Sequence, residues 1–211
     1  MKKALFIGAS SDIGIEVVKL LLKKKYYSYC TFYKNSQALR LLERKNPQKI
    51  NLFKLNLSKM SEVKKFVNRL KKNTKKIDLI ILGANIGIKR KKFELLNFRS
   101  FKNSICGNFL SNVFLLQFLV KLFIKQNNLK IIHISSLSSK KGSWGLSEYS
   151  SSKAALDNVL KCLDQEYNKL IIKLIYLGAV KTKGYTFTNK RKNKKNFITT
   201  FQAAKKILSS I

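Results

Sequence analysis

The sequence has few acidic residues. Ten Asp and Glu stand against 44 Lys and Arg in 211 residues, so the formal net charge is +34. So positive a surface attracts nucleic acid and anionic lipid without sequence preference. The lysines are scattered through every segment, however, and no recognised module or aromatic platform accompanies them. We therefore expect no specific nucleic-acid partner.

One basic run stands out, Lys190 to Lys195. A run of this kind forms either a solvated loop or a contact with an anionic substrate or partner. The sequence leaves both possibilities open.

Cysteine and proline are also scarce. Cys30, Cys106 and Cys162 are widely spaced, with no C-x-x-C motif and no Cys/His cluster, which argues against a disulfide scaffold and against a metal site. Pro47 is the single proline, and no Gly/Ser-rich linker divides the chain. We expect one domain over residues 1–211.

Long hydrophobic runs are missing too. The first apolar stretch has four residues, too few for a signal peptide, and the longest, Phe109 to Ile124, carries polar interruptions. We therefore expect Phe109 to Ile124 to form a buried helix. A cytoplasmic, soluble protein without a membrane span is the expectation.

Short apolar strands alternate with amphipathic stretches along the whole chain. The expected strands are Lys3–Ile7, Tyr27–Tyr33, Ile50–Leu55, Asp78–Gly83, Lys130–Ser135 and Leu170–Tyr176. The expected helices are 13–24, 36–45, 59–72, 98–125, 147–167 and 200–210. This alternation predicts a single doubly wound α/β domain with a parallel sheet of about six strands and helices on both faces. Such sheets bind ligands beyond the carboxyl ends of their strands.

A glycine turn follows the first expected strand. Gly8-Ala9-Ser10-Ser11-Asp12-Ile13-Gly14 opens a helix, and the free N–H groups of a helix start bind phosphate well. A plain strand-to-helix turn is the alternative. The position of this turn at the first strand favours a nucleotide.

Tyr149 and Lys153 stand four residues apart at the start of an expected helix, so they share one face. An ammonium this close favours the phenolate and is expected to lower the pKa of Tyr149 toward neutrality. A phenol tuned in this way exchanges a proton with a carbonyl or an alcohol. Ser136, thirteen residues before Tyr149, ends a strand and brings a hydroxyl to the same edge.

With these motifs the sequence resembles the short-chain dehydrogenase/reductase family over nearly its whole length. Residues 8–14 resemble the cofactor turn T-G-x-x-x-G-x-G of this Rossmann-fold family, with Ile7 for Thr and Asp12 for the middle Gly. The resemblance implies four catalytic residues, Asn108, Ser136, Tyr149 and Lys153. In that family Tyr donates the proton, Ser binds the carbonyl oxygen, Lys holds the nicotinamide ribose, and Asn anchors a water.

The resemblance also implies a cofactor site. The residues expected to contact the cofactor are Gly8, Ser10, Ser11, Asp12, Ile13, Gly14, Tyr33, Lys34, Asn56, Leu57, Gly83, Ala84, Asn85, Tyr149, Lys153, Gly178, Val180 and Thr182. Three segments depart from the family pattern: Asn56 replaces the usual Asp, Gly83-Ala84-Asn85 reorders N-A-G, and Leu177 replaces Pro. Asp12 could cap a helix that begins at Ile13.

Cofactor choice depends on the end of the second strand. An acid there binds the ribose 2′-hydroxyl of NAD, whereas basic residues accommodate the 2′-phosphate of NADP. Lys34 and Ser36 suit a phosphate, and the next acid is Glu43. NADP (NADPH) is therefore expected over NAD.

His133 invites another interpretation, because it shares a strand face with Ser135 and suggests a hydrolase dyad. No G-x-S-x-G elbow accompanies it, and the strand is apolar, so we expect a packed, hydrogen-bonded core histidine.

The sequence as a whole predicts an NADP(H)-dependent oxidoreductase that reduces a ketone, in which a keto sugar or another polysaccharide precursor is the favoured substrate. A 3-oxoacyl thioester reductase and a non-catalytic NAD(P)-binding regulatory protein are the alternatives. The partners expected are a small carbonyl or alcohol substrate and a second copy of the chain, in a homodimer or homotetramer.

Overall fold

The computed structural model describes residues 1–87, 90–126, 128–183, 197–209 and 211. Its centre is one six-stranded sheet in the order β3-β2-β1-β4-β5-β6, with every neighbouring pair parallel. The strands are β1 Lys3–Ile7, β2 Tyr27–Phe32, β3 Ile50–Lys54, β4 Leu79–Leu82, β5 Leu129–Ser136 and β6 Leu170–Leu177. The predicted doubly wound Rossmann sheet is confirmed. Each predicted strand lies within one or two residues of its observed bounds.

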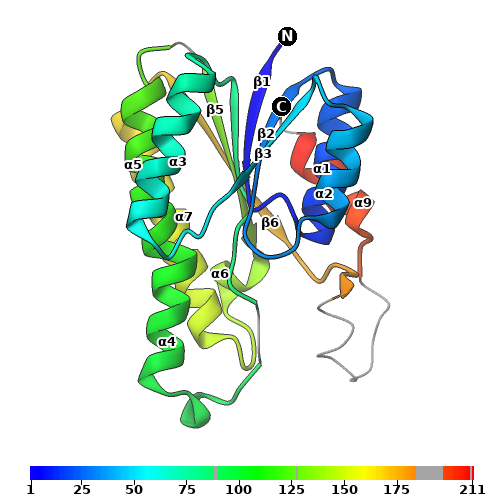
Figure 1. The fold of residues 1–211 in the computed structure, drawn as a ribbon. Coiled ribbons are helices and arrows are strands. Elements are labelled where there is room, and N and C mark those ends of the chain that lie inside the picture. Colours follow the sequence, from blue (N-terminus) through cyan, green and yellow to red (C-terminus); the bar gives the residue numbers. More distant parts are fainter. Residues whose placement is uncertain (88–89, 127, 184–196, 210) are drawn as a thin grey trace.

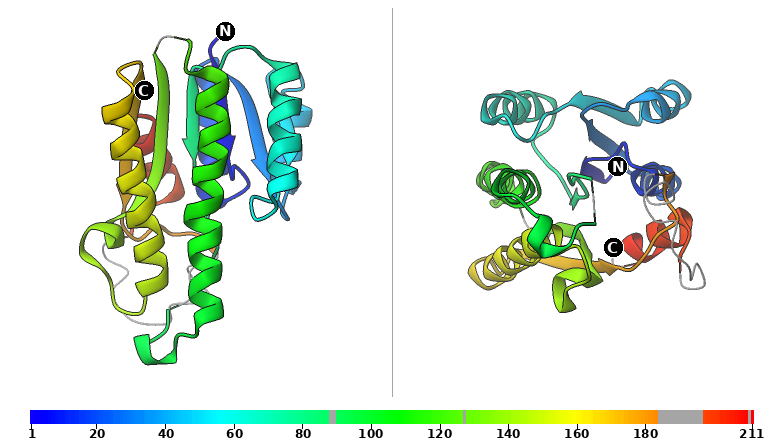
Figure 2. Two further views of the ribbon diagram at one scale, coloured as in Figure 1. Left: turned by 90° about the vertical axis from the view of Figure 1, so that its left-hand side faces the viewer. Right: turned by 90° about the horizontal axis from the view of Figure 1, so that it is seen from below.

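Helices cover both faces of the sheet (Figures 1 and 2). On one face lie α3 Met60–Asn73, α5 Ser111–Phe123 and α7 Ser147–Glu166, whose apolar side chains join a core with Leu5, Ile80 and Ile131. On the other face lie α1 Asp12–Lys23, α2 Gln37–Lys45 and α9 Thr200–Leu208, packed on Phe6, Cys30 and Ile132. Because both faces are buried, the strands are mostly apolar and do not alternate regularly between apolar and polar residues.

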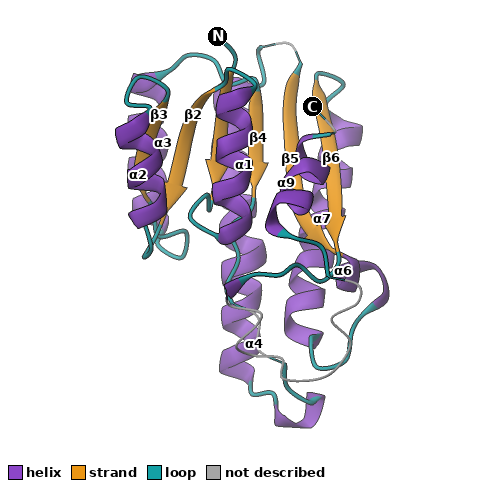
Figure 3. Ribbon diagram, turned by 90° about the vertical axis from the view of Figure 1, so that its right-hand side faces the viewer, coloured by secondary structure: helices purple, strands orange, loops and turns teal. Residues whose placement is uncertain are grey.

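The carboxyl ends of all six strands lie on the same side of the sheet. A smaller group of helices lies beyond these strand ends (Figure 3). This group contains the 3₁₀ turn η1 Phe93–Leu95, α4 Phe98–Ile105 and the short helix α6 Leu137–Lys141. The sequence pattern predicted neither η1 nor α6, because segments this short carry no periodic signal.

The predicted helix over 98–125 is interrupted by the π-helical turn η2 Cys106–Leu110. The Ser111 N–H donates to the Cys106 carbonyl, five residues back, which is the spacing of a π turn. The Ser111 hydroxyl donates to the same carbonyl at 2.6 Å. By length and composition, Phe98–Phe123 is the one described stretch that could cross a membrane. Part of it is nevertheless core, since Leu115, Leu116, Leu119 and Phe123 are buried against the sheet.

The first strand-to-helix turn is held close to the rest of the sheet. Gly8 has a φ of +83°, and its N–H donates to the Thr31 hydroxyl at 2.9 Å. A Cβ at Gly8 would lie 2.5 Å from the Ala84 Cα, which is main chain and has little freedom to move. The turn therefore needs glycine for its dihedral angle and for its space.

Gly8→Ala is expected to lower the free energy of unfolding by roughly 3 kcal/mol, because strain at positive φ adds to a main-chain clash. Gly142→Ala is the matched control: Gly142 has a φ of +66°, but nothing lies within 4 Å of its added Cβ. With a ψ of 175°, Gly142 lies in a region that essentially only glycine adopts, so its cost of about 1–2 kcal/mol is expected to come from backbone strain without a clash. Urea unfolding of both variants gives the comparison, and equal losses would contradict the role of the Ala84 contact.

Candidate active site

A cavity of about 810 Å³ opens at the carboxyl ends of the strands. Segments that follow β1, β4, β5 and β6 form its walls, as expected for a doubly wound sheet. The predicted site residues that line it are Ser10, Ser11, Asp12, Ile13, Gly83, Asn85, Ser136, Tyr149, Gly178, Val180 and Thr182. Segments far apart in the sequence are thus brought to one site.

Other predicted site residues lie outside the cavity lining. These are Gly8, Gly14, Tyr33, Lys34, Asn56, Leu57, Ala84, Asn108 and Lys153. Gly8, Gly14 and Ala84 shape the turn behind the wall: a Cβ on Gly14 would lie 2.4 Å from the Ala9 carbonyl oxygen. Lys153 and Asn108 are buried beneath the site, each about 1% exposed.

The start of α1 forms one wall of the cavity. Ser11 is the N-cap, and its hydroxyl accepts from the Gly14 N–H at 3.0 Å. The expectation that Asp12 caps a helix beginning at Ile13 is wrong, because Asp12 is itself the first helical residue and its Oδ2 accepts from the Lys183 N–H at 2.7 Å. That contact draws the Asp12 carboxylate toward the segment after β6.

These features fit the phosphate groups of a dinucleotide. The N–H groups in the first turn of a helix have no acceptor within the helix, and here that turn lies at the cavity wall. Glycine at positions 8 and 14 lets this turn pack directly against the main chain of Ala84 and Ala9. Asp12 is the one acid among the lining residues, and one of its carboxylate oxygens accepts a hydrogen bond from the Lys183 N–H.

Tyr149 lies in the first turn of α7, 8% exposed, and lines the cavity with Ser136 and Asn85. Burial raises the pKa of the Tyr149 phenol to about 12, and hydrogen bonding to the Ser136 and Asn85 side chains opposes this only in part. The phenol is therefore protonated across the neutral range.

Lys153 lies one turn further along α7, on the same face as Tyr149. Its Nζ donates to the Ile134 carbonyl at 3.1 Å and lies 6.0 Å from the centre of the Tyr149 ring. Burial lowers the pKa of Lys153 to about 8. The expectation that Lys153 lowers the pKa of Tyr149 toward neutrality is wrong for this arrangement, because the ammonium is directed at a main-chain carbonyl and burial dominates at the phenol.

Ser136 is the last residue of β5 and the N-cap of α6. Its Oγ accepts from the Ser138 N–H at 3.2 Å and lies 2.9 Å from the Ser138 Oγ. The strand end and the cap together fix the Ser136 hydroxyl in the cavity wall.

Asn108 lies in the π-helical turn η2. Its Oδ1 accepts from the Ile86 N–H at 2.6 Å, and its Nδ2 donates to the hydroxyls of Ser104 and Ser152 at 3.2 Å each. Asn108 thereby joins the segment after β4 to α4 and α7.

At the end of β2, Tyr33 and Lys34 are exposed, and the Lys34 Nζ lies 5.7 Å from the centre of the Tyr33 ring. Asn35, and neither Tyr33 nor Lys34, lines the cavity. Arg40, which the sequence analysis did not single out, lies outside the cavity lining, and its Nε donates to the Ser36 hydroxyl at 3.2 Å. One helical turn separates Arg40 from Ser36, and that spacing could have identified it.

The side chain and the main-chain N–H of Asn56 both form hydrogen bonds with residues close to it in the sequence. Its Oδ1 accepts from the Ser58 N–H at 3.1 Å, and its N–H donates to the Glu62 carboxylate at 2.9 Å. Leu57 packs against the core. Both residues shape the segment after β3.

The sequence interpretation also missed part of the cavity wall. Leu137, Ser138, Lys141 and Leu146 come from α6 and the segment leading to α7, and Arg90 follows β4. Arg90 donates to the Trp144 carbonyl, and the Lys91 N–H donates to the Gly145 carbonyl at 3.0 Å, so the two segments are joined. The basic run 190–195 lies outside the described residues. Within the described ranges, no three His, Cys, Asp or Glu side chains gather to hold a metal ion.

Comparisons with known proteins agree with this architecture. The chain is 28% identical over 187 residues to a fatty acyl-CoA reductase of Acinetobacter baylyi, covering 86% of this chain and 63% of that protein. It is 25% identical over 169 residues to an NADP-dependent 3-hydroxy acid dehydrogenase of Schizosaccharomyces pombe, covering 78% and 65%. It thus spans just under two thirds of the length of each of these relatives.

Among solved structures, a short chain dehydrogenase/reductase from Saccharomyces cerevisiae superimposes with a TM-score of 0.87 at 21% identity. The match covers 100% of this chain and 92% of that one, and it concerns the fold. The short chain dehydrogenase family model matches residues 2–194. The chain therefore belongs to the short-chain dehydrogenase/reductase family.

Proposed function

We propose that this protein reduces a ketone to an alcohol with NADPH, using Tyr149 as the proton donor. The observation that carries this proposal is a buried phenol, protonated at neutral pH, that lines a cavity together with the strand-end hydroxyl of Ser136. A phenol that keeps its proton is suited to donate it to the oxygen of a carbonyl that is being reduced.

The chain's own residues divide the work as follows. Tyr149 Oη donates its proton to the substrate oxygen, and the Ser136 hydroxyl, held by its place at the end of β5, hydrogen-bonds the same oxygen. Lys153 keeps a positive charge beneath the phenol, which opposes, without outweighing, the effect of burial against the phenolate formed when the proton leaves. NADPH, when bound, supplies the hydride.

The cofactor would lie across the start of α1 and the ends of β1 and β4. Ser10, Ser11 and Ile13 offer main-chain groups to the phosphates, and the small residue Gly83 leaves space beside them. At the end of β2, Lys34 and Arg40 provide positive charge for a 2′-phosphate, and no acid precedes Glu43 there. The dependence on NADP named for the yeast 3-hydroxy acid dehydrogenase is consistent with this assignment.

A 3-oxoacyl thioester is a second candidate substrate, favoured over a keto sugar by two observations. Part of the wall of the cavity that Tyr149 lines is apolar, including Leu137, Leu146 and Val180. The names of the two curated relatives described above concern acyl or hydroxy-acid compounds. The test is the rate of NADPH oxidation with acetoacetyl-coenzyme A, with a keto sugar and with a simple aliphatic ketone. The proposal is contradicted if the protein reduces none of the three compounds.

Tyr149→Phe is expected to reduce kcat by roughly 10²–10⁴-fold, because it removes the proton donor and keeps the ring. Binding of NADPH, followed by its fluorescence, should change little. Tyr167→Phe, at the far end of α7, is the matched control and should retain the wild-type kcat. Undiminished turnover in Tyr149→Phe would refute the assigned role.

The pH dependence follows from the two buried groups. Lys153 has a pKa of about 8 in the folded protein, lowered by burial, so its ammonium is lost as the pH rises through that value. Tyr149, with a pKa of about 12, stays protonated over the same interval. For reduction, kcat/KM is therefore expected to be constant in the neutral range and to fall above about pH 8. A profile that instead rises through the alkaline range would contradict this assignment.

Arg40→Asp and Lys34→Asp should each shift the ratio of the dissociation constants for NADPH and NADH toward NADH by roughly tenfold, or about 1.4 kcal/mol. The reason is that a negative charge would replace a positive one beside the 2′-phosphate. Lys45→Asp, at the other end of α2, makes the same charge change away from the site and should leave the ratio unchanged. If the ratio stays constant in both test variants, the basis for the NADP assignment is lost.

A further inference from the structure

A buried polar cluster lies directly beneath the proposed active site and takes no part in the mechanism above. Its centre is Asp157, which is 4% exposed in a chain with only ten acidic residues. A carboxylate is expensive to bury unless it is hydrogen-bonded or paired, so its partners are informative.

Asp157 lies on the same face of α7 as the two catalytic candidates. Tyr149, Lys153 and Asp157 follow one another at intervals of four residues, or about one helical turn. All three are less than a tenth exposed. The Tyr149 phenol, the Lys153 ammonium and the Asp157 carboxylate are therefore buried at successive turns on one face of α7.

The carboxylate holds the segment that contains Ser136. Asp157 Oδ2 accepts hydrogen bonds from the hydroxyls of Ser135 and Ser139, each at 2.8 Å. The Ser139 hydroxyl also lies 2.8 Å from the Ser136 carbonyl oxygen and 3.2 Å from the Ser135 hydroxyl. Residues on both sides of Ser136 are thus fixed to α7 through one oxygen atom.

The second carboxylate oxygen faces His133. Asp157 Oδ1 lies 3.6 Å from the His133 Nε2, beyond hydrogen-bond distance, and both side chains are buried. Burial lowers the pKa of His133 well below its ordinary value, and the positive charge of Lys153 acts in the same direction. His133 is packed in the core as we expected, but the expected hydrogen bond is wrong, because neither ring nitrogen has a hydrogen-bond partner among the described residues. A neutral His133 does not balance the charge of Asp157.

The charged and titratable groups around Asp157 come from four elements. They are His133 on β5, Lys153 and Tyr149 on α7, and Tyr176 on β6, over whose ring the Nζ of Lys140 from α6 lies at 3.9 Å from the centre. Of these, Lys153 is the buried cation. The negative charge of Asp157 raises its pKa and so opposes the effect of burial.

We propose that Asp157 is a positioning residue for the reduction: it fixes the Ser135–Ser139 segment that presents Ser136, and it places a carboxylate one helical turn beyond Lys153 on the same face of α7. The proposal rests on the proposed function, because it assigns Asp157 an effect on the proton donor and on the hydroxyl that binds the substrate. It gives Asp157 no contact with the substrate.

Two variants separate the two effects, with NADPH and acetoacetyl-coenzyme A as probes. Asp157→Asn removes the charge and keeps an oxygen that accepts hydrogen bonds. It is expected to move the alkaline limit of kcat/KM to lower pH by about one unit. Asp157→Ala also removes the hydrogen bonds and is expected to lower kcat by roughly 10- to 100-fold, with KM and NADPH binding changed by much less.

Asp164→Asn and Asp164→Ala are the matched controls, since Asp164 is an exposed acid two turns further along the same helix. They should reproduce the wild-type kcat and pH profile. Circular dichroism and urea unfolding identify variants that fold. Should Asp157→Ala fail to fold, the nearly isosteric Asp157→Asn still gives the pH profile. A folded Asp157→Asn variant with the wild-type pH profile and kcat overturns the proposal.

A double-mutant cycle of Ser139→Ala and Asp157→Ala on the free energy of unfolding tests the hydrogen bonds without any substrate. We expect the two losses to be non-additive, because either change removes the same hydrogen bond. Additive losses overturn the positioning of the Ser135–Ser139 segment. If the wild type reduces none of the test ketones, the proposed function fails, and the cycle alone decides whether the carboxylate holds this segment.

Discussion

The packing of α7 against the end of β5 is the constraint on which the site depends. It places an ammonium 3.1 Å from a strand carbonyl and two serine hydroxyls 2.8 Å from a carboxylate, in surroundings from which water is excluded. In such surroundings polar groups interact more strongly than in water, and an unpaired one is costly. The geometry of the catalytic candidates is therefore a property of the core. For the same reason, substitutions beneath the cavity are able to affect chemistry within it.

Most of the fold could be predicted because its signals are local and repeated. Apolar strands such as Leu79–Leu82 and amphipathic helices such as α3 follow from periodicity, and the strand ends then locate the site. The glycine turn identified the wall that follows β1, and Ser136 and Tyr149 identified the wall that follows β5. Structural features set by distant contacts were harder to predict. Asp12, for example, accepts a hydrogen bond from the Lys183 N–H, which is far away in the sequence. The helix α6 was missed for another reason, because its five residues are too few to show a periodic pattern.

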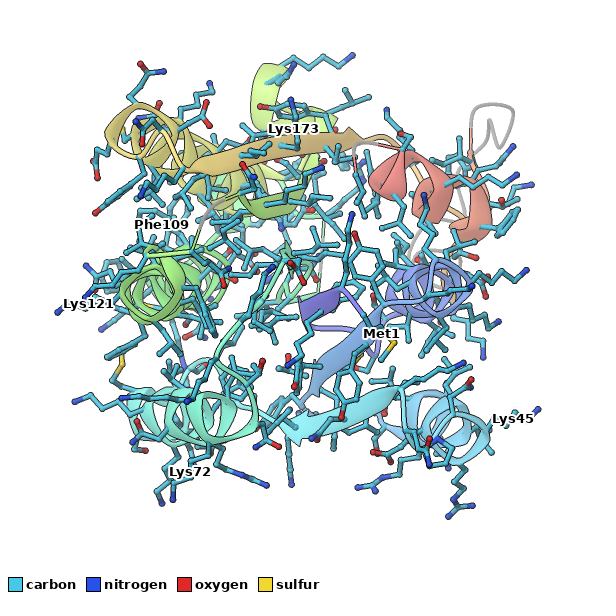
Figure 4. All side chains as sticks on the ribbon, turned by 90° about the horizontal axis from the view of Figure 1, so that it is seen from above. Met1, Lys45, Lys72, Phe109, Lys121 and Lys173 are labelled. Atoms are coloured by element: carbon cyan, nitrogen blue, oxygen red, sulfur yellow. The ribbon has the colours of Figure 1, made fainter. Side chains whose placement is uncertain are left out.

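The ionisation of Tyr149 shows why charge effects resist prediction from sequence. The four-residue spacing correctly placed Lys153 on the same face of α7 as Tyr149. The direction of the Lys153 ammonium, however, depends on the Ile134 carbonyl, and the burial of the Tyr149 phenol depends on residues from several elements. The surface charge, by contrast, is what composition indicated. Lysine side chains project from the outside of every layer, among them Lys45, Lys72 and Lys121 (Figure 4).

The π-helical turn between α4 and α5 also sets the rotational phase of two helices. Because an α-helix advances about 100° per residue, one additional residue in a turn rotates everything after it by that angle. Here α4 packs on α7, whereas α5 packs on α3 as well, so the two segments present different faces to the protein. An uninterrupted helix would have to satisfy both contacts with a single apolar stripe. Because the π-helical turn at Asn108 changes the rotation between α4 and α5, a single apolar stripe is not needed. Each of the two helices has its own pattern of apolar residues.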